Sequence, residues 1–73
     1  MNPQLENLLN KSYRYVGCSA DFCDDAWLLS DNTVLYFDLE VFNFYLLKVT
    51  SCFRILCEIA ICEADVYNII NKN

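Results

Sequence analysis

The sequence predicts a single small α+β domain over residues 1–73, in which a short N-terminal helix and a longer C-terminal helix flank a small antiparallel β-meander. Three patterns predict it: leucines at helical spacing near the start, a turn between two β-rich segments, and a polar stripe at helical spacing near the end. Because 56% of the residues are hydrophobic, the chain is expected to fold around one core rather than remain disordered.

Residues 2–12 are expected to form the first helix. Asn2 is a good N-cap residue, and Pro3 fits the first helical position, where no backbone N–H is needed. An apolar stripe with the i, i+3, i+4 spacing of one helix face would dock this helix on the core; it consists of Leu5, Leu8 and Leu9.

The middle of the chain is expected to form the meander, over residues 13–41. Residues 13–18 favour a first strand, in which Gly17 indicates a bulge or a close backbone approach. Residues 26–39 read as a β-hairpin, because the turn formers at 30–33 separate two segments rich in β-favouring side chains.

The last third contains neither Gly nor Pro, and two structures compete there. Val41–Val49 is assigned to a strand, with a helix capped by Asp38 as the alternative. For Ser51–Lys72 a helix is favoured, because polar residues recur at helical spacing over five turns. The competing interpretation is a strand, since apolar and polar residues alternate from Phe53 to Ile61.

Charge is unevenly distributed. The net charge is −5, and no Lys or Arg occurs between Tyr15 and Leu47. Phosphate binding and anionic membranes both require basic surfaces, so direct nucleic-acid binding and membrane binding are disfavoured. The acidic side chains within this stretch are Asp21, Asp24, Asp25, Asp31, Asp38 and Glu40.

The five cysteines are expected to be reduced, buried thiols of a cytoplasmic protein. The N-terminus lacks the basic and apolar regions of a signal peptide, and the odd count argues against a disulfide framework. The repeated spacing of four intervening residues does not bring three thiols to one side of a helix or a strand, so no metal site is expected.

Catalysis is also not expected. The chain has no His and a single Gly, so it lacks the usual base for a nucleophile and the material for a phosphate-binding loop. No cofactor is implied, and the adjacent carboxylates Asp24 and Asp25 have no second motif to support them.

The sequence therefore predicts a binding protein. The six acidic residues would face a protein partner with a basic surface, with Trp27 and Tyr36 as anchors; Tyr36, Asp38 and Glu40 would share one strand face. In size, charge and lack of motifs the chain resembles phage-encoded inhibitors of host defence, anti-CRISPR proteins included, which is an analogy and not a family signature. Such an inhibitor would act in the host cytoplasm and block a nucleic-acid-binding surface.

Two alternatives are kept. The first is a constitutive small subunit or homo-oligomeric interaction module, including a homodimer, because a chain of 73 residues gains stability from an interface. The second is a Cys-based metal-binding protein, which has less support from the spacing.

Overall fold

The structure is a computed structural model that describes residues 1–17, 25–52 and 54–72. It has the predicted α+β architecture, with a helix at each end of a five-stranded antiparallel sheet. In chain order the elements are α1 (Pro3–Ser12), β1 (Arg14–Tyr15), β2 (Asp25–Ser30), β3 (Thr33–Asp38), β4 (Asn43–Val49), β5 (Ile55–Ile61) and α2 (Glu63–Asn71).

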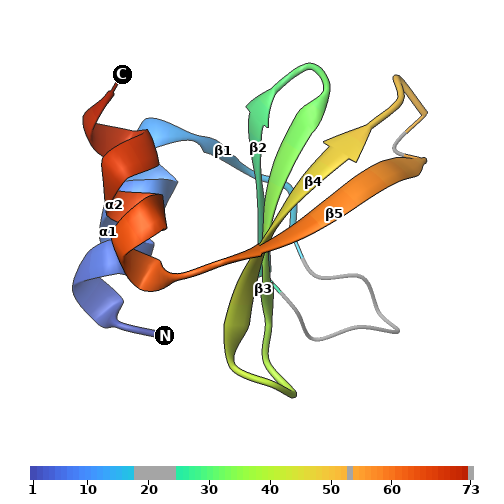
Figure 1. Ribbon diagram of the computed structural model, residues 1–73. Helices are drawn as coiled ribbons and strands as arrows, with labels where there is room; N and C mark the ends of the chain where they lie inside the picture. The colour runs from blue at the N-terminus through green and yellow to red at the C-terminus, as the bar shows by residue number, and fades with distance from the viewer. Residues whose placement is uncertain (18–24, 53, 73) are drawn as a thin grey trace.

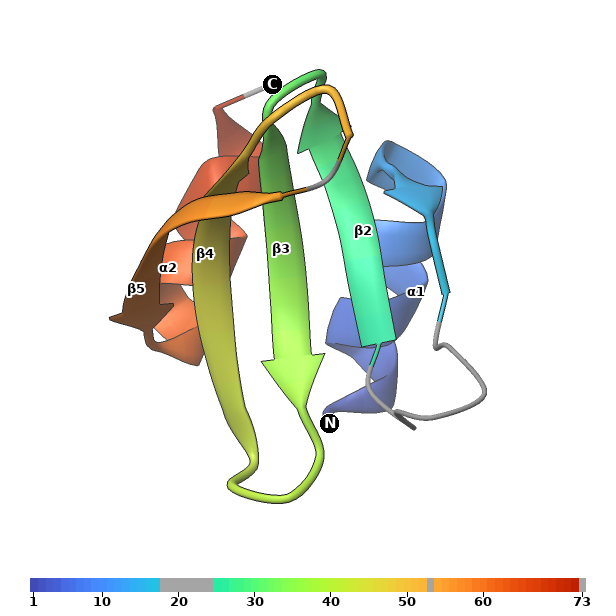
Figure 2. The same ribbon diagram turned by 90° about the vertical axis from the view of Figure 1, so that its right-hand side faces the viewer.

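The sheet is a meander whose spatial order is the chain order, so β1 and β5 form its two edges. Both helices lie on the same face of the sheet, with α1 behind β2 and α2 behind β4 in Figure 2. They run in the same direction: Asn2 Nδ2 donates to Glu63 Oε1 near their starts, and the Tyr13 hydroxyl donates to the Ile69 carbonyl near their ends.

The expected first helix is confirmed. The Asn2 side chain accepts a hydrogen bond from the Gln4 N–H at 2.9 Å, which satisfies one of the free donors at the helix start. Leu5 and Leu9 are fully buried, whereas Leu8 stays exposed at the border of the stripe. The helix therefore docks through two of its three leucines.

The main core lies between the helices and the sheet. Alternate residues of β3 point toward the helices, so Leu35 and Phe37 pack there with Trp27 of β2 and Phe44 of β4. The side chains that α1 and α2 contribute to the same cluster are Leu5, Leu9 and Val66.

The opposite face of the sheet carries a second apolar cluster. Val34, Leu47 and Val49 are buried there, and the rings of Tyr36 and Tyr45 lie 6.2 Å apart beside them. The β4–β5 hairpin bends away from the helices and passes over this face, as Figures 1 and 2 show from two sides. Curling of the sheet thus contributes to the burial of an apolar face that neither helix covers.

The predicted long C-terminal helix is wrong in its first half. Residues 55–61 form β5, which pairs with β4, and the helix begins only at Glu63 and has 9 residues against 10 in α1. The polar positions at helical spacing belong to two elements, and only their later members lie on α2. Pairing with β4 satisfies the backbone of the first segment, which local periodicity does not reveal.

The predicted first strand is also shorter than expected, because β1 comprises only Arg14–Tyr15. Gly17 follows it with φ of +96°, a conformation that side chains of L-residues rarely adopt. No atom lies within 4 Å of a Cβ built at this position, so the glycine serves the backbone conformation and not a close approach.

Candidate functional site at the acidic end

The topology separates charges along the strands. All five basic side chains lie toward the end of the sheet that carries the β2–β3 turn: Lys11 and Lys72 are near the helix C-termini, and the others are Arg14, Lys48 and Arg54. We call this the basic end. Lys48 pairs with Thr33, the first residue after the turn, and donates to its hydroxyl at 3.2 Å.

The other end of the sheet is acidic. It carries the β3–β4 turn, the start of β2 and the N-termini of both helices. Of the eight acidic residues within the described ranges, six lie there, and we call this region the acidic end: Glu6, Asp25, Asp38, Glu40, Glu63 and Asp65. A six-residue strand spans about 17 Å, so the two ends are well separated.

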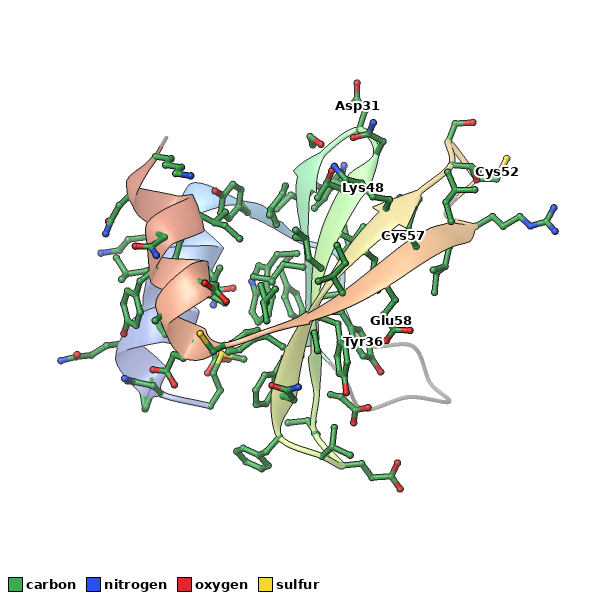
Figure 3. All side chains as sticks on the ribbon, viewed as in Figure 1. Asp31, Tyr36, Lys48, Cys52, Cys57 and Glu58 are labelled. Carbon is green, nitrogen blue, oxygen red and sulfur yellow. The ribbon has the colours of Figure 1, made fainter. Side chains whose placement is uncertain are left out.

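The predicted acidic site does not form one patch. Asp25, Asp38 and Glu40 belong to the acidic end, but Asp31 lies in the β2–β3 turn, at the end where Figure 3 also shows Lys48. Asp21 and Asp24 lie outside the described residues. The strands β2 and β3, of six residues each, run in opposite directions, so the turn between them lies at the other end of the sheet from Asp25 and Asp38. Asp31 belongs to that turn and is therefore separated from these two carboxylates.

Two of these carboxylates have local structural roles. Asp25 accepts a hydrogen bond from the Tyr15 hydroxyl at 2.7 Å, which connects the start of β2 to the edge strand β1. Asp38 Oδ1 accepts from the backbone N–H of Glu40 at 2.8 Å and of Val41 at 3.4 Å. Asp38 therefore closes an Asx-type turn and shapes the loop that follows it.

The prediction that Trp27 anchors a partner is wrong, because its side chain is fully buried in the core. Its indole N–H donates to Asn10 Oδ1 at 2.8 Å, and its ring meets the Tyr15 ring edge-on at 5.6 Å. Tyr36 is half-buried on the opposite face, where its ring lies beside the cluster of Val34 and Leu47. Tyr36 and Asp38 share that face as expected, whereas Glu40 lies beyond the strand.

The most exposed apolar side chains at the acidic end belong to residues that the sequence did not point to. Val41 and Phe42, in the β3–β4 turn, are 60% and 67% exposed. Phe42 has φ of +56°, in the left-handed region that a bulky residue seldom adopts, and its ring packs edge-on against Phe37 at 5.4 Å. The sequence feature that could have pointed to them is a pair of apolar residues in a segment that forms a turn without Gly or Pro.

A shallow pocket of about 270 Å³ opens beside this turn. It lies between the turn, the start of α1 and the start of α2, so three separate elements converge on it. Its lining combines aromatic surface with one carboxylate: Met1, Asn2, Phe37, Phe42, Asn43, Phe44 and Glu63. We refer to residues 39–42 together with this pocket as the tip site.

The cysteines differ from expectation in their burial. Cys52, Cys57 and Cys62 are free thiols, but all of them are exposed rather than buried; Cys18 and Cys23 lie outside the described residues. Within the described ranges, no group of three or more His, Cys, Asp or Glu side chains is arranged to hold a metal ion. The three exposed thiols are distributed over β5 and its two ends.

No family model, curated protein or solved structure matches this chain. Among the described residues, neither helix has the length and apolar character needed to cross a membrane.

Proposed function

We propose that this chain is a non-catalytic inhibitor that binds a basic, nucleic-acid-binding surface of a partner protein through its acidic end. The observation that carries the proposal is the separation of charge: six carboxylates gather at one end of the sheet, and all five basic side chains lie toward the other. A surface built to hold phosphates attracts such a negative field, so bound protein would exclude nucleic acid from it.

The tip site supplies the apolar part of this interface. Interfaces concentrate binding energy in a few buried aromatic anchors, surrounded by a polar rim. Phe42 is exposed and rises beside a pocket, while Asp38 and Glu40 flank it on the same turn. Burial of Phe42 and Val41 would stabilise the complex, and the carboxylates would select a basic partner.

The class of partner follows the analogy with phage-encoded inhibitors, which act on nucleic-acid-handling complexes of the host cytoplasm. The proposed mechanism needs no chemical step, cofactor or metal. Occupation of the groove by the acidic end is sufficient, because guide or target nucleic acid and the inhibitor compete for the same cations.

A pull-down against candidate nucleoprotein complexes tests the proposal with a matched pair of variants. The tip variant, Glu40→Gln with Phe42→Asn, removes one carboxylate and one apolar side chain from the acidic end. The control, Asp31→Asn with Leu56→Asn, removes the same two types of group elsewhere; Leu56 and Phe42 are both 67% exposed.

The tip variant is expected to capture at least about 10-fold less partner than the parent, which corresponds to about 1.4 kcal/mol. The control variant is expected to capture as much as the parent. Added nucleic acid should release the parent from the partner. Equal capture by the parent and the tip variant would show that the acidic end is solvated surface without a binding role.

The alternative of a homo-oligomeric module is favoured by one specific observation, the exposure of β5 on both of its faces. Self-association through that strand leaves the tip site on a different element, so the two properties can be tested separately.

A further inference from the structure

The outer strand β5 is unusually open. It forms one edge of the sheet, and each residue from Ile55 to Ala60 is exposed. The exposed apolar side chains point to both sides, since Ile59 pairs with Leu46 of the helix-facing side and Ile55 pairs with Val49 of the opposite side. Edge strands of monomeric proteins are usually blunted by Lys, Pro or bulges, because free backbone groups recruit further strands.

The protection of this edge is partial. A register shift near Val49 disturbs the ladder at the start of β5, and Glu58 is the single charged residue within the strand. Leu56 and Ile59 are 67% and 52% exposed, which is high for large apolar side chains in a β-strand. From Glu58 onward the ladder with β4 is regular.

The hydrogen-bond pattern of β4 identifies which backbone groups of β5 point away from the sheet. The Val49 N–H donates to Asn32 and so points toward β3, and directions alternate along β4. The backbone N–H and C=O of Leu46 therefore point toward β5, and those of its ladder partner Ile59 point back toward β4. It follows that Glu58 and Ala60 direct their N–H and C=O groups outward, away from the sheet.

We propose that β5 pairs antiparallel with β5 of a second copy of this chain, with Ile59 on the two-fold axis. This register places Glu58 opposite Ala60 twice, so the outward backbone groups of the two strands exchange hydrogen bonds. Ile59 meets its own copy across the axis. A register centred on Glu58 would instead oppose two carboxylates, which is destabilising.

Charge complementarity specifies a second copy in the antiparallel direction as the occupant. A two-fold axis at Ile59 brings the acidic end of each copy beside the basic end of the other. Arg54 precedes β5, while Glu63 and Asp65 follow it, so Arg54 of one copy would lie near these two carboxylates of the other. The five strands of each copy then form one continuous ten-stranded sheet.

Sedimentation equilibrium on the full chain tests this pairing, with three variants. Ala60→Pro removes an outward N–H that β4 does not use, and edge positions tolerate proline. Ile59→Lys places two cations against each other on the axis. Leu8→Lys is the control, because it makes the same kind of change at an exposed apolar side chain of α1, outside both the tip site and β5.

The parent is expected to form a dimer as concentration rises toward about 1 mM. Ala60→Pro and Ile59→Lys should raise the dissociation constant by about 100-fold or more, and Leu8→Lys should not change it. Circular dichroism at low concentration should show that each variant monomer folds. A parent that remains monomeric up to about 1 mM overturns the proposal, as does a dimer that tolerates both edge substitutions.

A disulfide tests the register directly. In the double variant Cys57→Ser with Ile59→Cys, the new thiols face each other across the axis at a Cα separation of about 4.5 Å, which suits a disulfide. Mild oxidation should give a covalent dimer linked through position 59 and should do so faster than in the parent. A cross-link that forms through Cys52 or Cys62 instead, or no covalent dimer, contradicts the register.

Discussion

Trp27 shows how one side chain joins several elements of this small domain. It is fully buried, its indole N–H donates to Asn10 of α1 at 2.8 Å, and its ring packs edge-on against Tyr15 of β1. Burial of this large ring and one directional hydrogen bond fix α1 against the sheet. A role in partner recognition would require that the core open.

Trp27→Ala is therefore expected to remove a large part of the stability of the protein. Truncation of a buried Trp costs about 3–5 kcal/mol, and a domain of this size has a total stability of only about 4–11 kcal/mol. Trp27→Phe retains most of the burial but loses the hydrogen bond and should cost about 1–3 kcal/mol. Urea denaturation followed by circular dichroism measures both, and wild-type stability of the Ala variant would contradict the core role.

The ionised side chain of Asp65 stabilises the start of α2. Its carboxylate accepts hydrogen bonds from the Cys62 N–H at 3.1 Å and from the Cys62 thiol at 3.2 Å. The backbone hydrogen bond, and then the thiol bond, lower the pKa of Asp65 below its usual value of 3.8. The charged form therefore favours the folded state.

The sign of the pH effect follows from this lowered pKa. The stabilisation is complete above the usual, unfolded-state pKa of 3.8 and is lost as the pH falls through the lower folded-state value. Asp65→Asn should make the stability of α2 less dependent on pH below about 4. Glu58→Gln, which removes an exposed carboxylate elsewhere, should leave the acid transition of α2 in place. Parallel acid titrations by circular dichroism compare the two, and identical acid curves for Asp65→Asn and the parent would refute this role.

Among the elements, the β3–β4 turn combines a structural carboxylate with a strained apolar tip. Asp38 accepts two backbone hydrogen bonds there, and Phe42 adopts a positive φ. The turn thus holds Val41 and Phe42 outward at a conformational cost of about 1 kcal/mol. Such strain is typical of segments whose side chains are positioned for contact.

Substitutions of Asp38 separate its structural role from its charge. Asp38→Ala should destabilise the domain by about 1 kcal/mol, because the two N–H groups lose their acceptor. Asp38→Asn keeps an acceptor oxygen and should be close to neutral in stability, while it removes one charge from the acidic end. Thermal unfolding measures both variants. Equal loss in the Asn and Ala variants would mean that charge, and not the turn hydrogen bonds, determines stability here.

The predictability of each element depended on how local its signals are. The helix cap at Asn2 and the turn at residues 30–33 act over a few residues, and both elements were predicted. For β5 two periodicities overlapped, a helical polar stripe and a strand-like alternation, and the helix was favoured; the decisive interaction is pairing with β4, which the local pattern does not show. The alternation of apolar and polar residues from Phe53 to Ile61 did indicate this strand, but the polar stripe that extends over five turns outweighed it.

The candidate site was only partly predictable for a related reason. Acidic residues that are neighbours in sequence separate to opposite ends of a hairpin, as Asp31 and Asp38 do. Trp27 was placed on the surface because it adjoins acidic residues, although its pairing with Leu35 puts it in the core. Phe42 was assigned to a strand within Val41–Val49, since the sequence does not show that the chain turns there.

In the whole molecule, acidic and basic residues are separated toward opposite ends of the sheet. This separation follows from the antiparallel strands and from the two helices, which run in the same direction. Both helix N-termini lie at the acidic end, where their partial positive charge stabilises carboxylates such as Asp65. Net charge of −5 thus becomes a directed field with a carboxylate-rich end and a basic end. The β3–β4 turn and the β5 edge lie on different elements, so separate substitutions address recognition and self-association.

The most direct measurement is displacement of labelled nucleic acid from a captured partner, followed by fluorescence anisotropy at several salt concentrations. We expect the parent to displace the nucleic acid at low salt and less well as salt screens the charges. The tip variant, Glu40→Gln with Phe42→Asn, should require at least about 10-fold more protein, and the control, Asp31→Asn with Leu56→Asn, should match the parent. Displacement by the tip variant at the parental concentration would contradict the assignment of the acidic end as the binding surface.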